Sequence, residues 1–224
     1  MLNLINGDCL EEMDRLQKES LDLILTDPPY GMSFQSNYRK EKYNSIVNDN
    51  NLDWLDEFVD KAYGLLKNDR HAYFFCSWHN VDKFKQSLEK KFNVKNILIW
   101  EKNNTGMGDL KGDYAPQYEM IIYCQKGHRE LNNGRHSNIL KFNKTKNEYH
   151  PTEKPVNMLE FLIKKSTNKN ESVGDFFSGS GSTLIASINT ERNCIGIELD
   201  NGYYNISKKR VDIAKKNYQP ELFY

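Results

Sequence analysis

The sequence predicts a single α/β domain built on a doubly wound, mostly parallel sheet of seven strands. Short apolar segments rich in β-branched and aromatic residues alternate along the chain with segments whose apolar residues recur at helical spacing. The strand segments are almost continuously apolar, which is typical of strands covered by helices on both faces. A chain of 224 residues is also long enough to bury a sizeable core in one domain.

The individual elements follow from these two patterns. The expected strands are residues 2–5, 21–26, 72–76, 96–100, 119–124, 173–177 and 194–198. The expected helices are residues 10–17, 54–66, 81–91, 155–166, 182–189 and 203–216. The fourth helix begins at Pro155, because proline is favourable as a first helical residue. No helical segment separates residues 96–100 from residues 119–124, so these strands are expected to form an antiparallel hairpin at one edge.

Composition narrows the class of protein. Lys+Arg and Asp+Glu are both 31, and the zero net charge argues against a chain that simply coats nucleic acid. The four cysteines are widely spaced and form no C-x-x-C pair, which favours reduced thiols. The five histidines lack the spacing of metal ligands, so no metal is expected. Without a signal peptide or a long apolar run, the protein is expected in the cytoplasm, away from membranes.

A glycine turn follows the strand at residues 173–177. Its sequence is Ser178-Gly179-Ser180-Gly181, and glycine allows positive φ and close contact of a ligand with the backbone. A dinucleotide fingerprint would need a third small residue where Leu184 stands, and the P-loop lysine is also missing. Glu198 ends the next strand about 20 residues on, where a carboxylate can bind ribose hydroxyls. The turn therefore fits a nucleoside without pyrophosphate, such as S-adenosylmethionine; the alternative is a close strand–helix crossing that needs glycine for packing.

A second turn, Asp27-Pro28-Pro29-Tyr30, leaves the strand at residues 21–26. The two prolines fix two φ angles and remove two backbone donors, so the carbonyls point outward without a nearby N–H. The Asp27 carboxylate and the Pro28 carbonyl form a rigid acceptor pair for both hydrogens of an –NH2 group, and Tyr30 offers a flat face to a ring. The alternative is a tight surface turn that begins with aspartate.

This acceptor pair suits methylation of an amino group on a base. The amino group of adenine is a poor nucleophile, and two acceptors stabilise the positive charge that develops on it during methyl transfer. The base must leave the duplex to be reached. For the methyl and amino groups to meet, the strands that lead to Asp27 and to Asp175 must be neighbours at their carboxyl ends, as ligand sites in doubly wound sheets require.

With these motifs, the chain resembles the bacterial DNA amino-methyltransferases, and the order of its motifs resembles their β group. In that group the catalytic tetrapeptide comes first, a target-recognition region follows, and the glycine turn of the cofactor site comes last. The resemblance implies a site-specific enzyme, and aspartate at the first position of the tetrapeptide favours N6 of adenine. Cytosine N4 stays an alternative, as do, further off, an amide of RNA or protein and a DNA-binding relative without turnover.

The resemblance also implies the roles of individual residues. Asn6-Gly7-Asp8-Cys9-Leu10 resembles the segment that meets the adenine of the cofactor, and the segment from His150 to Pro155 places Thr152 and Lys154 near its methionine carboxylate. Residues 100–103 and 118–119 resemble the strands that flank the target base. The implied catalytic residues are Asp27, Pro28, Pro29 and Tyr30. The implied cofactor-binding residues are Asp8, Cys9, Thr152, Lys154, Asp175, Phe176, Ser178, Gly179, Gly181, Ser182, Thr183, Glu198 and Leu199.

Three long polar segments, residues 31–51, 103–116 and 127–149, interrupt the alternation, and loops of this length commonly form lids or binding loops. The whole chain, 1–224, is expected to be the methyltransferase domain, with 127–149 as a short basic target-recognition insert and 217–224 as a C-terminal tail. The residues expected to contact DNA are Arg39, Lys40, Lys102, Arg129, Arg135, Lys141 and Lys144. For any single lysine among them, a solvated surface position is an equally good interpretation.

The chain ends in Gln219-Pro220-Glu221-Leu222-Phe223-Tyr224. The stretch from Gln219 to Phe223 resembles the short peptide by which replication proteins dock on the sliding clamp, and an apolar tail suits binding in a groove. The simpler alternative is a tail packed on its own domain. Besides DNA, the resemblance leaves open a cognate restriction endonuclease, an orphan enzyme without one, and a homodimer.

Overall fold

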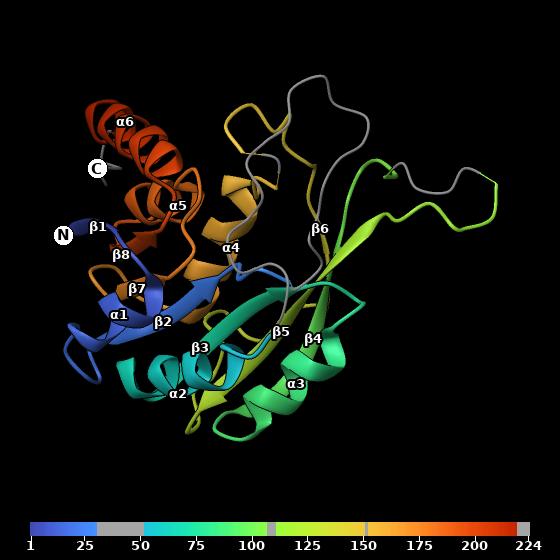
Figure 1. Cartoon of the computed structure of the whole chain (residues 1–224), viewed down its shortest axis with the longest axis horizontal. Coiled ribbons are helices and arrows are strands. Elements are labelled where there is room, and N and C mark those ends of the chain that lie inside the picture. Colours follow the sequence, from blue (N-terminus) through green and yellow to red (C-terminus); the bar gives the residue numbers. More distant parts are fainter. Residues whose placement is uncertain (31–51, 107–110, 151, 219–224) are drawn as a thin grey trace.

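Figure 1 shows the computed structural model of the chain, in which residues 1–30, 52–106, 111–150 and 152–218 are described. One sheet runs through the molecule between two layers of helices. The strands are β1 (Leu2–Asn6), β2 (Leu21–Thr26), β3 (Leu66–Cys76), β4 (Asn93–Glu101), β5 (Tyr118–Lys126), β6 (Ile139–Lys141), β7 (Ser172–Asp175) and β8 (Asn193–Glu198). The helices are α1 (Cys9–Asp14), α2 (Leu55–Leu65), α3 (Val81–Glu89), α4 (Val156–Ser166), α5 (Ser182–Asn189) and α6 (Asn201–Asn217).

The sheet has the order β1-β8-β7-β2-β3-β5-β4-β6. The strands from β1 to β3 in this order are all parallel, whereas β5 is antiparallel to both β3 and β4. The predicted class, a doubly wound and mostly parallel sheet with an antiparallel hairpin, is therefore confirmed. The strand order reverses between β7 and β2, and doubly wound sheets bind their ligands at such a point.

Two details of the sheet differ from the expectation. The structure adds an eighth strand, β6, which pairs in parallel with β4 and forms the outer edge beyond the hairpin. It is only three residues long, with Leu140 buried between two exposed neighbours, and so short a stretch carries no clear periodicity. Strand β3 begins at Leu66, because α2 leads straight into it, and the polar residues 67–70 hide this start in the sequence.

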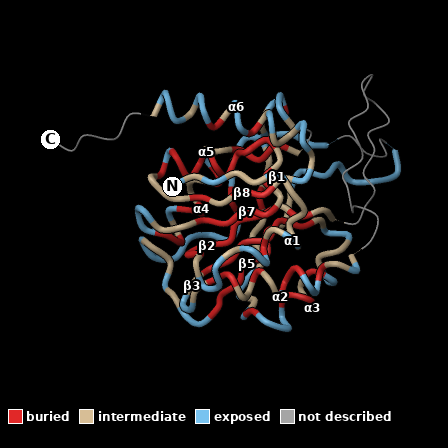
Figure 2. The backbone as a smooth tube through the Cα atoms, turned by 60° about the vertical axis from the view of Figure 1, so that its left-hand side comes forward, coloured by how far each residue is buried: buried red, intermediate tan, exposed pale blue. Residues whose placement is uncertain are grey.

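The core consists of one cluster on each face of the sheet. Helices α2 and α3 pack on one face, and α4, α5 and α6 pack on the other. All six residues of β2 are buried, with Leu21 and Ile24 in one cluster and Leu23 and Leu25 in the other. Figure 2 shows this buried centre, in red, running through β2, β7 and β8. Burial on both faces is the physical reason for the continuous apolar pattern of the strands.

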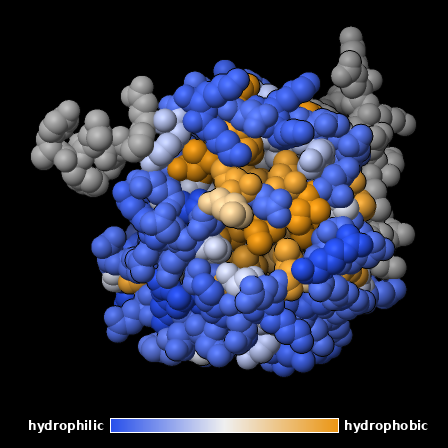
Figure 3. Space-filling view, turned by 90° about the vertical axis from the view of Figure 1, so that its left-hand side faces the viewer, coloured by the Kyte–Doolittle hydropathy of each residue, from blue (hydrophilic) through white to orange (hydrophobic). Residues whose placement is uncertain are grey.

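The two edges of the sheet have different surfaces. Figure 3 views the molecule from the side of β1, where hydrophobic side chains line a hollow within a hydrophilic rim. The β1 residues Leu2, Leu4 and Ile5 are only partly buried, and Met1 and Ile213 are exposed. At the other edge, the short strand β6 is followed by exposed polar residues. The sheet therefore ends in an apolar strand on one side and in a polar segment on the other.

The cysteines are present as thiols. All four cysteines are free, and Cys76, Cys124 and Cys194 are buried, as their apolar sequence surroundings predict. In the described ranges, no helix has the length and apolar character needed to cross a membrane. Within the same ranges, no three His, Cys, Asp or Glu side chains lie close enough together to hold a metal ion.

Candidate active site

The two motifs lie side by side at the carboxyl edge of the sheet. Strands β2 and β7 pair in parallel, with Leu23 opposite Val173 and Ile24 opposite Gly174. At the ends of these strands, the Thr26 hydroxyl donates to Asp175 Oδ1 over 3.0 Å. The same hydroxyl oxygen accepts a hydrogen bond from the backbone N–H of Phe176, at 3.2 Å. The predicted adjacency of two strands that lie far apart in the sequence is confirmed.

The two glycines of the turn have different surroundings. Gly181 has φ +85°, and a Cβ there would lie 2.2 Å from Ser207 Oγ on α6, so backbone conformation and close packing both favour glycine at this position. Gly179 has φ +50°, and a Cβ there would lie 3.6 Å or more from its nearest neighbours, the atoms of the His150 ring, which is an ordinary contact distance. Close packing therefore adds to the need for glycine at Gly181, whereas at Gly179 only the backbone conformation favours glycine.

Glu198, at the end of β8, is fixed by backbone donors. Its Oε2 accepts from Gly179 N at 2.7 Å and its Oε1 from Asp200 N at 2.9 Å. Burial raises the pKa of Glu198, and these two hydrogen bonds oppose the rise. Beside it, β1 pairs with β8, and Gly7 N donates to the Glu198 carbonyl at 3.1 Å, which brings Asp8 to the same edge. The Glu198 carboxylate is therefore held at the carboxyl edge, beside the glycine turn.

Asp8 and Cys9 begin helix α1. The Asp8 carboxylate accepts from the backbone N–H of Leu10 at 2.8 Å and so acts as an N-cap. The second carboxylate oxygen leaves Asp8 able to accept a further hydrogen bond. Burial raises the pKa of the Cys9 thiol to about 12, so this cysteine is neutral and unreactive. Asp8 thus offers a ligand a hydrogen-bond acceptor, and Cys9 offers it an apolar contact.

The tetrapeptide turn is held by its own side chains and by α3. The Tyr30 hydroxyl donates to Asp27 Oδ1 at 2.5 Å, and Asn80 Nδ2, at the start of α3, donates to the Tyr30 carbonyl at 2.7 Å. Pro28 is buried, and Asp27 is partly buried. Burial raises the pKa of Asp27, although the neighbouring Lys154 offsets part of this rise. The carboxylate is thus a partly desolvated acceptor whose orientation is fixed.

Lys154, in the turn before α4, contacts this carboxylate. Its ammonium donates to Asp27 Oδ2 and lies 3.2 Å from Glu119 Oε2 on β5. Lys102, just after β4, in turn binds Glu119 Oε1 at 2.6 Å. The resemblance places Lys154 at the methionine carboxylate of the cofactor, but here its ammonium lies on the tetrapeptide carboxylate. Lys102, expected to bind DNA, pairs with Glu119, and its side chain is only 17% exposed.

The residues before Lys154 cover the glycine turn. The His150 ring lies 4.3 Å from the Tyr203 ring on α6 and faces Gly179. Its Nδ1 accepts from the backbone N–H of Thr152 at 3.2 Å and lies 3.1 Å from the Thr152 hydroxyl. Burial lowers the pKa of His150 to about 4, so the ring is neutral and can accept these hydrogen bonds. Thr152 therefore lies close to the glycine turn.

Comparison with known proteins agrees with this geometry. A family model described as DNA methylase matches residues 21–209. The chain belongs to the DNA methylase family. It is 30% identical to the Type II methyltransferase M2.MboI of Moraxella bovis, over 93% of this chain and 86% of that protein. It is 26% identical to the DNA adenine methyltransferase YhdJ of Escherichia coli (strain K12), over 98% of this chain and 85% of that protein.

A solved structure extends the similarity to the cofactor. The crystal structure of the M1.HpyAVI–SAM complex superposes with a TM-score of 0.72 at 28% identity, covering 94% of this chain and all of that one. S-adenosylmethionine is the cofactor of this DNA methylase, and DNA is its substrate.

The residues at the glycine turn fit this cofactor. Ser182 Oγ is buried at the start of α5 and has no hydrogen-bond partner in the part of the chain that is described, so a ligand atom would satisfy it. Leu199 is 42% exposed directly after Glu198, although it is apolar. Thr183 bonds instead to Asp175, whose pKa burial raises to about 6. Acceptors, a hydroxyl and an exposed apolar side chain suit a nucleoside with ribose hydroxyls and a flat base.

Two side chains of the predicted cofactor set point away from this site. Phe176 is fully buried, with its ring 5.9 Å from Phe58 in the core. The Ser178 hydroxyl donates to the Ile197 carbonyl at 3.0 Å and is buried as well. Each side chain is satisfied inside the protein, so the prediction that Phe176 and Ser178 bind the cofactor now concerns their backbone and stays a prediction. Phe177, by contrast, is partly buried against Trp54 and Phe58.

The predicted DNA contacts separate into different groups. Arg39 and Lys40 lie outside the described residues. Lys141, the last residue of β6, and Lys144, just after it, are exposed on the same edge as Glu119. The Lys141 ammonium lies 3.3 Å from Glu101, but its side chain is 76% exposed. Both lysines therefore lie on the surface at the carboxyl edge of the sheet, and their predicted contact with DNA stays a prediction.

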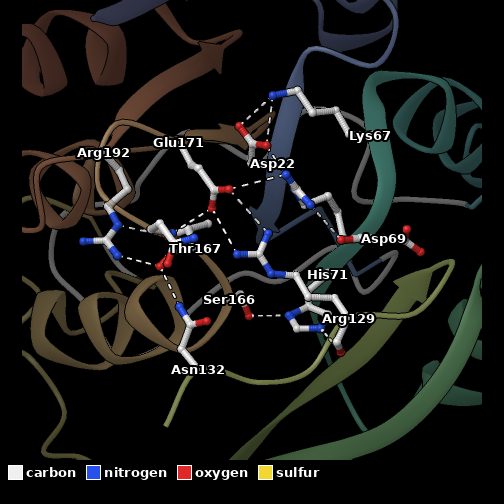
Figure 4. Close-up of polar contacts among 12 residues, drawn as sticks. Asp22, Lys67, Asp69, His71, Arg129, Asn132, Ser166, Thr167, Glu171 and Arg192 are labelled. Carbon is white, nitrogen blue, oxygen red and sulfur yellow. Dashed lines mark hydrogen bonds and ion pairs between the residues drawn. The ribbon is translucent and has the colours of Figure 1, made fainter.

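Arg129 has a protein partner, Glu171, so its predicted contact with DNA stays a prediction that this ion pair does not support. Figure 4 shows its guanidinium facing Glu171, with Nη2 3.3 Å from Oε2, at the amino-terminal ends of β2 and β7. Its side chain is only 13% exposed. Arg135 is exposed, but it follows Gly134, whose carbonyl accepts from Lys165 at the end of α4, away from the tetrapeptide. The first half of the basic insert thus lies at the opposite edge from the tetrapeptide.

Three residues that support the site were not among the predicted site residues. Thr26 links the two strands, Asn80 fixes the Tyr30 carbonyl, and Glu119 holds the two lysines. Thr26 is one more strand residue in the sequence, and Asn80 is one of many polar residues before a helix. Only Glu119 had a signal, because it lies in the segment that resembles the strands flanking the target base.

Proposed function

We propose that this DNA methylase transfers a methyl group from S-adenosylmethionine to the N6 amino group of an adenine flipped out of DNA. One observation carries the proposal: the Thr26 hydroxyl joins the strand that ends in Asp27 to the strand that ends in the glycine turn. An acceptor site for an amino group therefore lies beside the site for the methyl donor. Such an arrangement supports transfer between two bound groups without their diffusing apart.

When it is bound, the sulfonium of the cofactor supplies an activated methyl group. The Asp27 carboxylate and the Pro28 carbonyl accept the two amino hydrogens and stabilise the positive charge that develops on the nitrogen. Tyr30 is held against Asp27 by its hydroxyl, so its ring has a fixed direction for stacking on the flipped base. After the methyl group bonds to nitrogen, the nitrogen must lose a proton, and the Asp27 carboxylate is placed to accept it.

The proposed cofactor residues follow from their positions at the glycine turn and the neighbouring strand ends. Asp8, Glu198 and Asp175 supply carboxylates or fix the turn, while Gly179, Ser182 and Leu199 present backbone, hydroxyl and apolar surface. Thr152, beside His150, is proposed to line the same site. Gly181 and Thr183 support the turn from behind, through Ser207 and Asp175.

Adenine rather than cytosine is proposed as the target base. Asp27 as first residue of the tetrapeptide supports adenine, and so does the similarity to YhdJ, a relative described as a DNA adenine methyltransferase. Cytosine also presents an exocyclic amino group, and the same two acceptors would hold its N4. The choice of adenine over cytosine is therefore a more specific proposal than methyl transfer to a base of DNA.

Lys141 and Lys144 are proposed to bind DNA phosphates, and residues 127–149 to act as a short recognition insert. Phosphate contacts position the duplex and do not read its sequence, so the target sequence must be set by other groups. Both lysines lie at the edge that carries Asp27, where a flipped base must arrive.

Further partners stay predictions. The similarity to the Type II methyltransferase M2.MboI supports a cognate restriction endonuclease as the proposed context, with an orphan enzyme as the alternative. A homodimer is a prediction that oligomer mass in solution would test. The clamp-binding stretch Gln219 to Phe223 lies outside the described residues. Deleting residues 219–224 and repeating a pull-down with the sliding clamp tests it, and unchanged binding or no binding by either protein would end that idea.

The test of the main proposal is direct. The purified protein is incubated with labelled S-adenosylmethionine and unmethylated DNA, and the modified nucleoside is identified by mass spectrometry, with Asp27→Ala as the control. N6-methyladenine that is absent with the variant is the expected result. N4-methylcytosine would overturn the assignment of the base and keep the mechanism. A protein that binds the cofactor but methylates no base in DNA would point to RNA, to a protein amide or to a relative without turnover.

A further inference from the structure

Four buried or partly buried charges alternate in sign across the active site. Asp27, Lys154, Glu119 and Lys102 come in that order, from the end of β2, the turn before α4, the start of β5 and the end of β4. Lys154 binds Asp27, its distance to Glu119 is 3.2 Å, and Lys102 lies 2.6 Å from Glu119. The chain of charges is therefore neutral as a whole and begins at the proposed catalytic carboxylate.

Lys154 is more enclosed than Lys102. Its side chain is only 7% exposed, and its ammonium lies 5.0 Å from the centre of the Phe75 ring. A buried ammonium needs partners, and the described residues provide two carboxylates and the Thr152 carbonyl, at 3.3 Å. The lysine is therefore held between Asp27 and Glu119 and does not extend into solvent.

The two carboxylates hold Lys154 differently. Asp27 accepts a hydrogen bond from it, and the ammonium lies 3.2 Å from the buried Oε2 of Glu119. The contact of Lys154 with Glu119 is the longer of the two. Burial alone would raise the pKa of Glu119, but Lys154 and Lys102 outweigh burial and lower it, so Glu119 is ionised.

We propose that Lys154 is a positioning residue for Asp27, and that Glu119 positions Lys154 in turn. The inference rests on the proposed function, because it concerns the acceptor of the amino hydrogens. An ionised carboxylate has about four acceptor positions. Tyr30 and Lys154 take one position on each oxygen of Asp27, which fixes the rotation of the carboxylate and leaves other positions for the amino group.

The titratable groups that face Asp27 determine what the loss of Lys154 does. They are the charged Lys154 and Glu119, the neutral Tyr30 and Cys76, and Asp175, with Lys102 behind Glu119. Lys154 is the main group that favours the ionised form of Asp27, and Glu119 opposes it. Without Lys154, Asp27 faces Glu119 with no cation between them, so its pKa rises and its protonated fraction at neutral pH grows.

This role differs from the cofactor contact that the family resemblance implies for Lys154. An anchor of the methionine carboxylate would act on the affinity for the cofactor. A positioning residue of Asp27 would act on turnover and on its pH dependence, with the affinity for cofactor unchanged. The two roles are thus separated by the dissociation constant of the cofactor and by kcat.

The experiment compares Lys154→Met, Glu119→Gln and the double variant in DNA methylation. For Lys154→Met, kcat is expected to fall roughly a hundredfold, since a small displacement of a catalytic group has effects of that order. The acid limb of the pH profile should move to higher pH, and the cofactor affinity should change less than about twofold, a negligible free energy. Adding Glu119→Gln should restore part of kcat, because it removes the unbalanced charge that faces Asp27. Lys85→Met is the matched control, since Lys85 pairs with Glu89 on the exposed surface of α3.

A second readout needs no turnover. In protein labelled with ¹³C at aspartate carboxyls, Asp27 is identified by its loss in Asp27→Asn and titrated by NMR. Its pKa should rise in Lys154→Met, fall again in the double variant and stay unchanged in Lys85→Met. An unchanged Asp27 pKa, a tenfold weaker cofactor affinity with kcat retained, or purely additive losses in the double variant would overturn the inference. A wild-type protein that methylates no DNA would instead overturn the proposed function, while the titration still decides the role of Lys154.

Discussion

Strand β2 carries an aspartate at each end, and the two have opposite environments. Asp22, at the amino-terminal end, accepts four hydrogen bonds: two from Lys67 at 2.9 Å, one from Arg70 at 2.9 Å and one from the Ser172 N–H at 3.0 Å. Asp27, just past the carboxyl end, accepts only two from described residues, from Tyr30 and Lys154. The first carboxylate is saturated by donors, whereas the second keeps free acceptor positions.

The pKa values move in opposite directions for the same reason. Burial alone would raise the pKa of Asp22, but hydrogen bonds from Ser172, Lys67 and Arg70 outweigh burial and lower it. At Asp27, burial prevails over the single neighbouring lysine, and the pKa is raised. Each end of the sheet holds a network of alternating charges, but among the described residues the network at Asp27 is the incomplete one of the two. An incomplete network of this kind is what a site for a donor substrate requires.

The largest effect should come from Asp27→Asn. An amide of the same shape keeps one acceptor oxygen but loses the charge that stabilises the transition state, so kcat should fall on the order of a thousandfold. Because Lys154 keeps Glu119 as a partner, the melting temperature should stay close to that of the wild type. Steady-state methylation and thermal unfolding measure the two quantities. A variant that unfolds early while keeping its turnover would place Asp27 with Asp22 among structural residues.

The reverse result is expected for Asp22→Asn. This change leaves Arg70 and Lys67 beside a neutral group at the amino-terminal end, and losing charge-assisted hydrogen bonds to a buried carboxylate costs roughly 2 kcal/mol of stability. Without denaturant, the kcat of the variant should equal that of the wild type, since the carboxyl edge of the sheet is unchanged. Urea unfolding at pH 7 gives the free energy of unfolding of the variant and of the wild type.

Because the pKa of Asp22 is lowered in the folded protein, its contribution is present above the ordinary value of 3.8 and disappears as the pH falls through the folded value. The difference between Asp22→Asn and the wild type should therefore shrink at strongly acid pH. A stability loss that stays the same at acid pH would show that lost packing, rather than lost charge, is responsible.

At Asp175, on the carboxyl edge of the sheet, stability should depend on pH in the opposite direction from that at Asp22. Burial raises its pKa from 3.8 to about 6, which corresponds to ~3 kcal/mol of stability that is present below pH 3.8 and lost as the pH rises through 6. Asp175→Asn removes this titration and keeps a hydrogen-bonding group beside Thr26. The free energy of unfolding of the variant minus that of the wild type should therefore be larger at pH 8 than at pH 4, as measured by urea unfolding at both values. An equal difference at the two pH values would contradict a buried, titrating Asp175.

Much of this site was predictable because its motifs are local. Two prolines after an apolar strand define the tetrapeptide turn, and Gly179 and Gly181 define the other turn, each with a positive φ. The switch-point rule then predicts that the two strands are neighbours, and β2 and β7 are. Local chemistry and one topological rule were enough to predict that the tetrapeptide turn and the glycine turn lie side by side.

The charge partners were not predictable, because they come from remote segments. Lys154 lies 127 residues from Asp27 and Arg129 lies 42 residues from Glu171, and ion pairs of this kind leave no periodic trace in a sequence. A lysine in a polar segment has the same sequence signature whether it binds phosphate, a buried carboxylate or water. For the same reason Lys102 and Arg129 were expected on DNA, although each has a protein partner. Strand β6 escaped prediction because three residues show no period.

The smallest effects concern the basic insert, whose two halves lie at opposite edges of the sheet. Lys144→Gln, at the edge of Asp27, should remove one phosphate contact, weaken DNA binding and reduce the slope of log affinity against log salt by about 1. Arg129→Gln should leave that slope unchanged and lower the unfolding free energy by about 1 kcal/mol, because it removes a partner of Glu171. Fluorescence anisotropy with labelled DNA across a salt series, together with urea unfolding, measures both variants. A reduced slope for Arg129→Gln would mean that DNA reaches around to the amino-terminal edge, where Asp22 lies. Equal slopes for Lys144→Gln and the wild type would instead leave the exposed lysines after β6 as solvated surface and move the phosphate contacts to another part of the chain.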